Sequence, residues 1–272
     1  MPHASLQLAM IQMAVEGGEA DINLRHAADL IRQAAEDGAQ LALLPECMDL
    51  GWTHPSTPEL AAPIPSGTPF RTLQYLAKEL SIHICAGLAE RDGNHVFNAA
   101  VLIAPDGQLL LRHRKLNELA IAHDVYAQGD SLSVVHTSLG HIGILICSDA
   151  FAQHQTLSRS LGYMGADLIL SPCAWAVDAD HDNDREPYGD IWRNAYIPVA
   201  REFSLPIIGV SNVGPLKGGP WEGRNCIGNS MAIGPSGEIL AQGRHGADAE
   251  EIILIEVPLV ERPKRGDEWA GH

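Results

Sequence analysis

The sequence lacks the features expected of nucleic-acid-binding and membrane proteins. Only 18 Lys and Arg oppose 34 Asp and Glu, which gives a formal net charge of -16, and no basic run alternates with aromatic residues. A chain with this charge cannot neutralise a phosphate backbone, so no nucleic-acid partner is expected. No apolar run approaches the roughly 20 residues of a transmembrane helix, so no membrane-embedded part is expected either.

Signals for targeting, disulfides and cofactors are also missing. Residues 1–13 contain no basic segment, long apolar stretch or cleavage site of a signal peptide, which predicts a cytoplasmic location. The five cysteines are odd in number, widely spaced and form no CxxC pair, so at least one thiol is free for chemistry. The sequence contains no phosphate-binding glycine motif and no HxxxH metal spacing, which gives no support for nucleotide or metal binding.

The apolar content is high enough for a large core. Hydrophobic residues make up 46% of the 272 residues. No low-complexity segment or Pro/Gly/Ser linker divides the chain, although residues 63–69 form a loop. The sequence therefore predicts one domain over residues 1–272, with a short C-terminal tail at 260–272.

Hydrophobic periodicity predicts alternating strands and helices. The predicted order is strand 6–13, helix 23–37, strand 40–44, helix 68–80, strands 82–88, 96–103 and 108–112, strand 142–147, helix 155–164, strand 168–171, helix 190–202, strands 207–211 and 230–233, and a final strand pair ending near residue 257. A similar order and a Pro-X-Gly turn occur in both halves. This repetition predicts an α/β fold, a four-layer α-β-β-α sandwich of two mixed sheets rather than a Rossmann sheet.

Three polar side chains follow predicted buried strands. Glu46 comes after LALLP, where half-burial would raise its pKa toward that of a general base. Lys115 lies in RHRKL just past a strand, and Cys147 follows GILI, beside backbone N–H groups that can face an oxyanion. Each residue alone has an ordinary alternative, respectively a surface acid, a solvated cationic edge and an inert core thiol.

Taken together, these segments resemble the nitrilase superfamily of carbon–nitrogen hydrolases, in particular its amidase-like branch. The family signatures are a Glu after an apolar strand, a Lys in an (H/Y)RK segment and a Cys ending a G-x-x-I-C strand. They match Glu46, Lys115 and Cys147. Further matches extend over nearly the whole chain, at residues 98–100, 129–130, 165–167, 192, 200–201 and 229–230.

The resemblance implies a thiol hydrolase that works through a thioester. Glu46 would take the thiol proton, Cys147 would attack the substrate carbon, and Lys115 with the Ser148 N–H would hold the oxyanion. The protonated Glu46 would return its proton to the leaving amine, and water activated by Glu46 would hydrolyse the thioester. This chemistry needs no metal and no organic cofactor, and its only other partner is a small-molecule substrate.

One position departs from the family pattern. Many members carry a second glutamate seven residues before the glycine that corresponds to Gly129, and here that position is Ala122. If residues 118–126 form a helical turn, Glu118 lies four residues earlier on the same face and could supply the missing carboxylate. The alternative is that Glu118 is a solvated acid at a helix start, and His123 is a weaker substitute.

Two further features concern the substrate. The resemblance implies that Trp175 forms a wall of the substrate pocket, and a core aromatic residue is the alternative. The segment 178–186 (DADHDNDRE) is dense in acids. It is either an exposed loop or, if it lies near the pocket mouth, a feature that favours a cationic substrate.

The leading functional prediction is an amidohydrolase for a small aliphatic amide or N-carbamoyl amine. The alternative is a nitrilase, although Ser148-Asp149 after the cysteine differs from the Trp-Glu of family nitrilases. A third interpretation, a catalytically idle binding member, is disfavoured because Glu46, Lys115 and Cys147 are all present. The resemblance also implies a homodimer or higher homo-oligomer.

Overall fold

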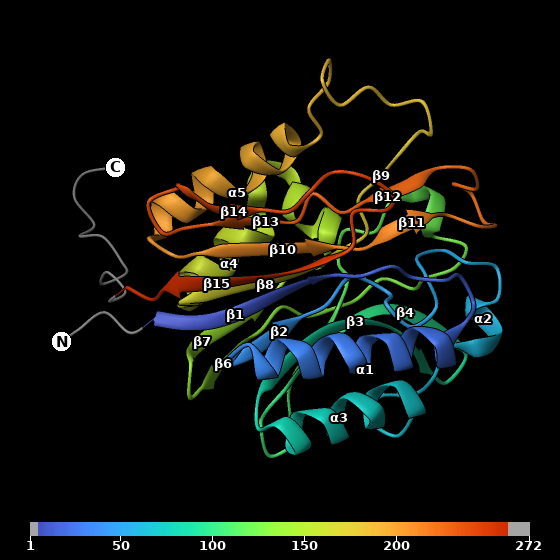
Figure 1. Cartoon of the computed structure of the whole chain (residues 1–272), viewed down its shortest axis with the longest axis horizontal. Coiled ribbons are helices and arrows are strands. Elements are labelled where there is room, and N and C mark those ends of the chain that lie inside the picture. The colour runs from blue at the N-terminus through green and yellow to red at the C-terminus, as the bar shows by residue number, and fades with distance from the viewer. Residues whose placement is uncertain (1–4, 261–272) are drawn as a thin grey trace.

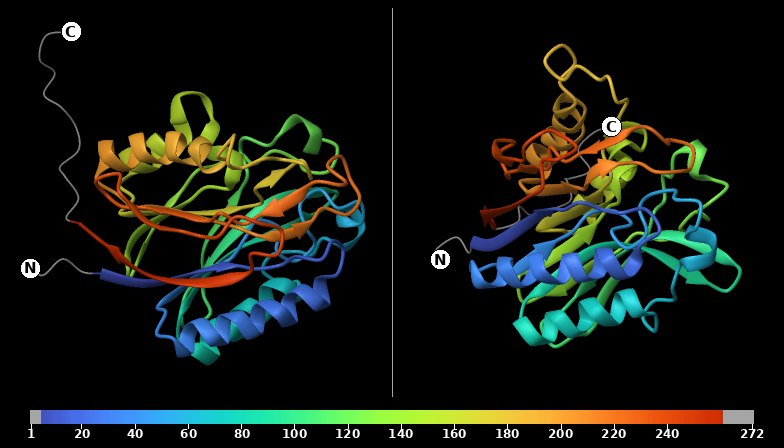
Figure 2. Two further views of the ribbon diagram at one scale, coloured as in Figure 1. Left: turned by 45° about the horizontal axis from the view of Figure 1, so that its top comes forward. Right: turned by 45° about the vertical axis from the view of Figure 1, so that its right-hand side comes forward.

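The computed structural model describes residues 5–260, so almost all of the predicted tail at 260–272 lies outside the described residues. Two six-stranded sheets face each other, and helices cover their outer faces (Figure 1, Figure 2). The predicted four-layer α-β-β-α sandwich is therefore confirmed. No helix in residues 5–260 is long and apolar enough to span a membrane.

The first sheet has the strand order β15-β1-β2-β3-β4-β5. It is mixed, because β1, β2 and β3 are parallel whereas β4, β5 and β15 join by antiparallel pairing. Its strands are β1 (Ser5–Gln12), β2 (Leu41–Leu43), β3 (His83–Asp92), β4 (His95–Ile103), β5 (Leu109–Arg114) and β15 (Glu251–Pro258). Helices α1 (Ala20–Glu36) and α3 (Thr68–Leu80) cover its outer face, and the short α2 (Thr57–Leu60) lies between them in the chain.

The second sheet has the order β14-β13-β10-β8-β7-β6 and is also mixed, with a parallel centre of β7, β8 and β10. Its strands are β6 (Val134–Thr137), β7 (Gly140–Ile144), β8 (Leu168–Cys173), β10 (Ile207–Ser211), β13 (Met231–Ile233) and β14 (Ile239–Gln242). Helices α4 (Thr156–Met164) and α5 (Gly189–Phe203) cover it. A small third sheet contains β9 (Ala176–Val177), β11 (Val213–Pro215) and β12 (Asn225–Ile227).

Side-chain alternation along the strands produces these layers. In β1, Leu6, Leu8 and Met10 join the apolar cluster between the two sheets, whereas Ala9 and Ile11 join the cluster under α1 and α3. A strand buried on both faces reads as a continuous apolar run, which is the pattern of residues 8–11 in the sequence. A third cluster joins the second sheet to α4 and α5.

Two sequence-based strand predictions are wrong. The predicted strand 142–147 ends early, because β7 stops at Ile144 and Cys147 begins the 3-10 helix η2 (Cys147–Phe151). The predicted final strand pair does not form, since β14 pairs with β13 and β15 pairs with β1 in the other sheet. Elements as short as β6 and β9 give no periodic signal long enough to detect.

The carboxyl ends of β2, β5 and β7 lie at one end of the sandwich. Two antiparallel pairings separate β5 from β3, and β3 is parallel to β2, so β5 runs in the same direction as β2. The Glu46 N–H, just past β2, donates to the carbonyl of Cys173 at the end of β8 at 3.1 Å. Since β8 is parallel to β7, this bond brings the matching ends of the two sheets together.

Candidate active site

Glu46 lies in a turn that approaches β3 closely. Its side chain is 1% exposed. Gly87 of β3 permits this approach, because a Cβ added at Gly87 would lie 2.5 Å from the Glu46 Cα. A carboxylate buried in this way requires hydrogen-bonding partners inside the protein.

Lys115 points into the protein because side chains alternate along β5 and into the next residue. Arg112 and Arg114 point outward, and each pairs with Glu90 at 2.7 Å. The Lys115 side chain lies on the inner face and is 2% exposed. The cationic edge considered from the sequence therefore describes the two arginines and not Lys115, although Arg114 is only partly exposed.

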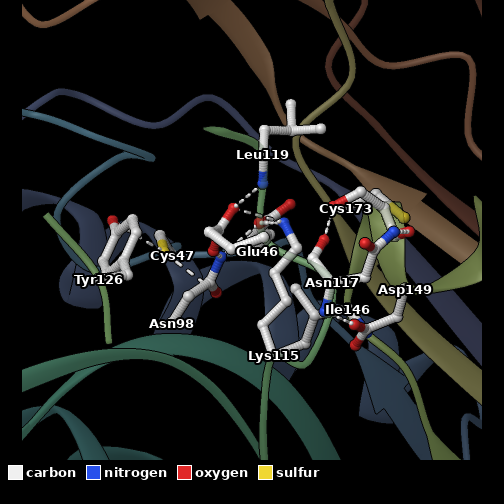
Figure 3. Close-up of polar contacts among 12 residues, drawn as sticks. Glu46, Cys47, Asn98, Lys115, Asn117, Leu119, Tyr126, Ile146, Asp149 and Cys173 are labelled. Carbon is white, nitrogen blue, oxygen red and sulfur yellow. Dashed lines mark hydrogen bonds and ion pairs between the residues drawn. The ribbon is translucent and has the colours of Figure 1, made fainter. Parts of the chain in front are cut away.

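Four side chains form a closed set of polar contacts around the Lys115 ammonium (Figure 3). Lys115 Nζ donates to Glu46 Oε1 at 2.7 Å and lies 3.2 Å from Glu118 Oε1. Asn98 Nδ2 donates to Glu46 Oε1 at 2.6 Å and to Glu118 Oε2 at 3.0 Å. These contacts bring together the predicted base and the predicted cation. Glu46 follows β2 and Lys115 follows β5, and these two strands are not neighbours in the sheet.

Glu118 lies beside the predicted cation, because its carboxylate forms this 3.2 Å ion pair with Lys115. The Glu118 side chain is 3% exposed, so it is not a solvated surface acid. The helical turn supposed for residues 118–126 is wrong, because only the three-residue 3-10 helix η1 (Ala120–Ala122) forms there and Glu118 precedes it. A catalytic role for Glu118 stays a prediction.

Cys147 has a left-handed backbone conformation, with φ at 45°. This conformation is uncommon for a residue with a Cβ, costs on the order of 1–3 kcal/mol and is concentrated at functional sites. The turn takes the thiol out of the strand, and among the five cysteines only Cys147 is not fully buried. The charges of Glu46 and Lys115 both affect the pKa of this thiol, Glu46 raising it and Lys115 lowering it.

Asp149 holds the turn of the candidate nucleophile in place. Its Oδ2 accepts hydrogen bonds from the Ile146 N–H at 2.9 Å and from His113 Nε2 at 2.8 Å. Its Oδ1 accepts from the N–H groups of Leu116 and Asn117 at 3.0 and 2.7 Å. This fully buried carboxylate thus connects the turn that contains Cys147, after β7 of the second sheet, with the segment that contains Lys115, after β5 of the first sheet (Figure 3).

The electrostatics of the site favour a neutral thiol beside a proton acceptor. Burial raises the pKa of Glu46, and the Lys115 charge only partly offsets this rise. Burial lowers the pKa of Lys115, but the carboxylates of Glu46 and Glu118 raise it well above its ordinary value. Burial, a hydrogen bond with Cys173 and the Glu46 charge raise the pKa of Cys147 well above its ordinary value, while Lys115 opposes this rise. Cys147 therefore needs a base before it can act as a nucleophile.

Ser148 and Trp175 occupy positions that leave their predicted roles untested. The Ser148 hydroxyl donates to the Asn117 carbonyl at 2.7 Å, so this side chain serves the turn, and the oxyanion contact assigned to its N–H stays a prediction. Trp175 is 0% exposed and stacks on Trp192 with ring centroids 4.2 Å apart. This position agrees with the core-aromatic alternative, and a role as a pocket wall stays a prediction.

Three buried residues that support the site had no role assigned from the sequence. The sequence indicates Asn98 only as part of a family match and indicates no role for His113 or Asp149. Alternation along β5 places His113 on the same inner face as Lys115, which is a usable signal. The pairing of His113 with Asp149 has no local signal, because His113 lies on β5 of the first sheet whereas Asp149 lies in η2, after β7 of the second sheet.

A cavity of about 490 Å³ opens beside Glu118. It is lined by the segment between β5 and β6, through Leu116, Asn117, Glu118, His123, Tyr126, Ala127 and Gln128. Within residues 5–260, no group of three or more His, Cys, Asp or Glu side chains is arranged to hold a metal ion. The ionisable lining of this cavity is a carboxylate, an imidazole and a phenol, with no lysine or arginine.

The acid-rich segment 178–186 is exposed at all five of its acidic residues, as expected for a solvated loop. The loop preceding α5 extends away from the sheets in Figure 1. Asp178 pairs with Arg224 at 2.9 Å, and the remaining acids are open to solvent. An influence on substrate charge stays a prediction.

Comparison with known proteins gives a match over almost the whole chain. Residues 7–262 match the family model described as "Carbon-nitrogen hydrolase". A protein named nitrilase from Pyrococcus abyssi is 28% identical over 270 residues, which cover 96% of this chain and 94% of that protein. Omega-amidase NIT2 from Bos taurus is 33% identical over 183 residues, which cover 63% of this chain and 64% of that protein, less than two thirds of its length.

Solved structures share the fold. The crystal structure of a carbon-nitrogen hydrolase from Helicobacter pylori has a TM-score of 0.82 at 23% identity, covering 94% of this chain and 90% of that chain. An amidase from Nesterenkonia sp. has a TM-score of 0.78 at 20% identity, covering 95% of this chain and 92% of that chain. These likenesses confirm the layered α/β architecture.

Proposed function

Because the chain belongs to the carbon–nitrogen hydrolase family, we propose that it is a thiol amidohydrolase for a small aliphatic amide or N-carbamoyl amine. The observation that carries the proposal is the buried 2.7 Å ion pair of Lys115 and Glu46, next to the one cysteine that is not fully buried. Burying two charges costs solvation free energy. A costly ion pair beside a strained cysteine turn supports a catalytic use.

In the first half of the proposed reaction, Glu46 takes the proton of the Cys147 thiol. The sulfur attacks the carbonyl carbon, and the negative charge on the resulting oxyanion is balanced by the Lys115 ammonium and the Ser148 N–H. The protonated Glu46 then gives its proton to the leaving nitrogen. The carbon–nitrogen bond breaks, ammonia or an amine leaves, and the acyl group remains on Cys147 as a thioester.

In the second half, water replaces the amine. Glu46 takes a proton from this water, whose oxygen attacks the thioester carbon. Collapse of the second tetrahedral adduct breaks the carbon–sulfur bond, and the proton held by Glu46 returns to the sulfur. The cycle converts one amide and one water into an acid and an amine.

The second candidate function is that of a nitrilase, and the match to a relative with that name over 94% of its length favours it. Ser148 and Asp149 after the cysteine support the amidase instead, because family nitrilases typically have Trp-Glu there. The negative loop 178–186 and a cavity lined by Glu118 support a neutral or cationic substrate over an anionic one.

Release of ammonia from a panel of aliphatic amides, N-carbamoyl amines and nitriles tests the proposal. We expect turnover of amides or carbamoyl amines and its loss in Cys147→Ala, by on the order of 10⁴-fold or more. Turnover of nitriles alone would support the second candidate. A folded wild-type protein that hydrolyses no member of the panel would support the binding-only interpretation, and an active Cys147→Ala would exclude Cys147 as the nucleophile. A cytoplasmic location stays a prediction.

A further inference from the structure

Asn98 contacts both carboxylates of the site through one atom. It lies on β4 and is 1% exposed. Its side-chain amide carries two hydrogens. Nδ2 lies 2.6 Å from Glu46 Oε1 and 3.0 Å from Glu118 Oε2, so each hydrogen serves a different carboxylate (Figure 3).

A second set of contacts, to the carbonyl oxygen of the Asn98 side chain, fixes the orientation of this amide. The Cys47 thiol donates to Asn98 Oδ1 at 3.5 Å, and Cys47 Sγ lies 3.4 Å from the Tyr126 hydroxyl. Tyr126 in turn accepts the Thr53 N–H at 3.2 Å. A flipped amide would place its oxygen against two carboxylates and leave it without a donor, so only the observed orientation satisfies the buried groups.

The contacts of Glu46 distinguish its two oxygens. Oε1 accepts from both Asn98 and Lys115. Within residues 5–260, Oε2 has no hydrogen-bond partner. Oε2 is therefore the Glu46 oxygen that neither Asn98 nor Lys115 contacts.

We propose, on the basis of the proposed function, that Asn98 is a positioning residue that bridges Glu46 and Glu118 and presents Glu46 Oε2 to the Cys147 thiol. The bridge acts only on the ionised form of Glu46, because an amide N–H stabilises a carboxylate by donating to it. Asn98 thereby lowers the pKa of Glu46, against the larger effect of burial. The hydrogen bond keeps the base ready at a lower pH than burial alone would allow.

Several other groups facing Glu46 also set its ionisation. Lys115 lowers the pKa of Glu46 and Glu118 raises it. Three thiols are close enough to interact with its charge, those of Cys47, Cys147 and Cys226. Burial raises the pKa of each of these thiols well above neutrality, so they stay uncharged at neutral pH.

The test is Asn98→Ala, with two pH-dependent readouts. Loss of the bridge should lower kcat/KM near neutral pH by roughly 10-fold to 10²-fold. The acid limb of the pH profile of kcat/KM should move up by about one pH unit, so that kcat/KM recovers at higher pH. The rate at which iodoacetamide alkylates Cys147 should shift by the same amount, because it reports proton transfer to Glu46 without any substrate. Asn98→Asp should lose more activity, since its carboxylate cannot donate to Glu46 or Glu118.

Matched variants separate positioning from folding. Asn94→Ala removes an exposed asparagine from the turn of the same hairpin and should leave both profiles unchanged. If Asn98→Ala does not fold, Cys47→Ala removes the thiol that donates to Asn98 Oδ1 and should shift the acid limb of the pH profile in the same direction. Cys47→Ser keeps a donor at this position. The proposal would be overturned if Asn98→Ala lost activity equally at every pH, with the acid limb of its pH profile unmoved. It would also be overturned if Cys47→Ala and Cys47→Ser had the same acid limb.

The two readouts also separate this proposal from the proposed function. If Asn98→Ala shifts the alkylation profile while the wild type hydrolyses no substrate, the positioning role holds and the amidohydrolase proposal fails. If the wild type hydrolyses amides and neither profile moves in Asn98→Ala, the function holds and the positioning role fails.

Discussion

Glu46, Glu118 and Lys115 bring two carboxylates and one ammonium into contact inside the protein. A single ammonium cannot balance the charge of both carboxylates. Neutral donors supply the rest of the stabilisation, from Asn98 to both acids and from the Leu119 N–H to Glu118 Oε1 at 3.1 Å. The excess of acceptors over cations explains how a buried glutamate can serve as a proton acceptor.

Replacing Glu118 tests whether its carboxylate takes part in turnover. We expect Glu118→Gln to lower kcat by roughly 10²-fold, because it removes the second carboxylate that Lys115 and Asn98 contact. Steady-state kinetics and the free energy of unfolding should be measured together, since a misfolded variant would imitate a catalytic loss.

The matched control for this variant is Asp124→Asn, which removes an exposed carboxylate from the same segment. Its turnover should stay close to that of the wild type. A well-folded Glu118→Gln enzyme with near-native kcat would show that turnover does not need the Glu118 carboxylate, which leaves Glu46, Lys115 and Cys147 as the catalytic residues.

At the scale of elements, Asp149 connects η2 with β5 and the segment after it through four hydrogen bonds, one of them from its own turn. Asp149→Ala would leave His113 and three backbone N–H groups without their acceptor in a buried place. We expect the free energy of unfolding to fall by roughly 3–5 kcal/mol, and kcat to fall as well, because the cysteine turn and Lys115 lose their common support. Urea denaturation and kinetics measure the two effects.

A comparison with Asp106→Asn shows whether burial causes this loss. Asp106 is exposed and accepts one hydrogen bond, from the Gln108 N–H at 2.9 Å. Its replacement should change the free energy of unfolding by less than about 1 kcal/mol. Equal effects for Asp106→Asn and Asp149→Ala would contradict the role given to the buried carboxylate.

The loop after β2 contains an acid whose burial affects stability in a pH-dependent way. Burial raises the pKa of Asp49 to about 7, although the Ala89 and Leu50 N–H groups donate to its carboxylate. An unfolded aspartate titrates near about 3.9. Between these two values the folded protein holds a proton that the unfolded chain has released, so the free energy of unfolding falls as the pH rises.

Asp49→Asn removes this titration. The wild type should lose on the order of 4 kcal/mol relative to Asp49→Asn between about pH 4 and pH 7. Urea unfolding of both proteins at several pH values gives this difference, in which the titration of other groups cancels. Parallel stability curves for the two proteins would show that Asp49 is already ionised at acidic pH.

At the scale of the whole molecule, the helical layer of α4 and α5 exposes large apolar side chains. Tyr163, Met164 and Ile191 are 67%, 48% and 46% exposed. Such residues on one outer layer favour association, and we expect a dimer of twice the 29.2 kDa chain mass through this layer. Sedimentation velocity should give this mass for the wild type and the monomer mass for Tyr163→Glu combined with Ile191→Glu.

Tyr75 provides the control for this prediction, because it is 62% exposed but lies on α3 in the opposite helical layer. Tyr75→Glu should leave the sedimentation coefficient unchanged. Dissociation by Tyr75→Glu, with no effect of the double variant, would place the interface on the α1–α3 side.

The elements that the sequence predicts well are those with a long local period. Helix α3 agrees with its prediction at both ends, since its apolar face repeats over several turns between a Gly-Thr-Pro start and a polar end. The end of β7 was misplaced because the apolar run continues to Cys147, while the backbone leaves the strand after Ile144 to form a left-handed turn. Apolar content alone does not distinguish a buried strand from a buried turn.

The sequence by itself determined the layered architecture, because hydrophobic period is a local property. It also determined Glu46, Lys115 and Cys147 as candidates, because the motifs that carry the family resemblance are short segments of the chain. Only the tertiary structure decided which side chains meet. The ion pair of Glu46 with Lys115 joins strands separated by β3 and β4, and Asp149 connects the two sheets. Contacts of this kind depend on strand order and on how the sheets face each other, and neither property is encoded in the spacing of residues along the chain.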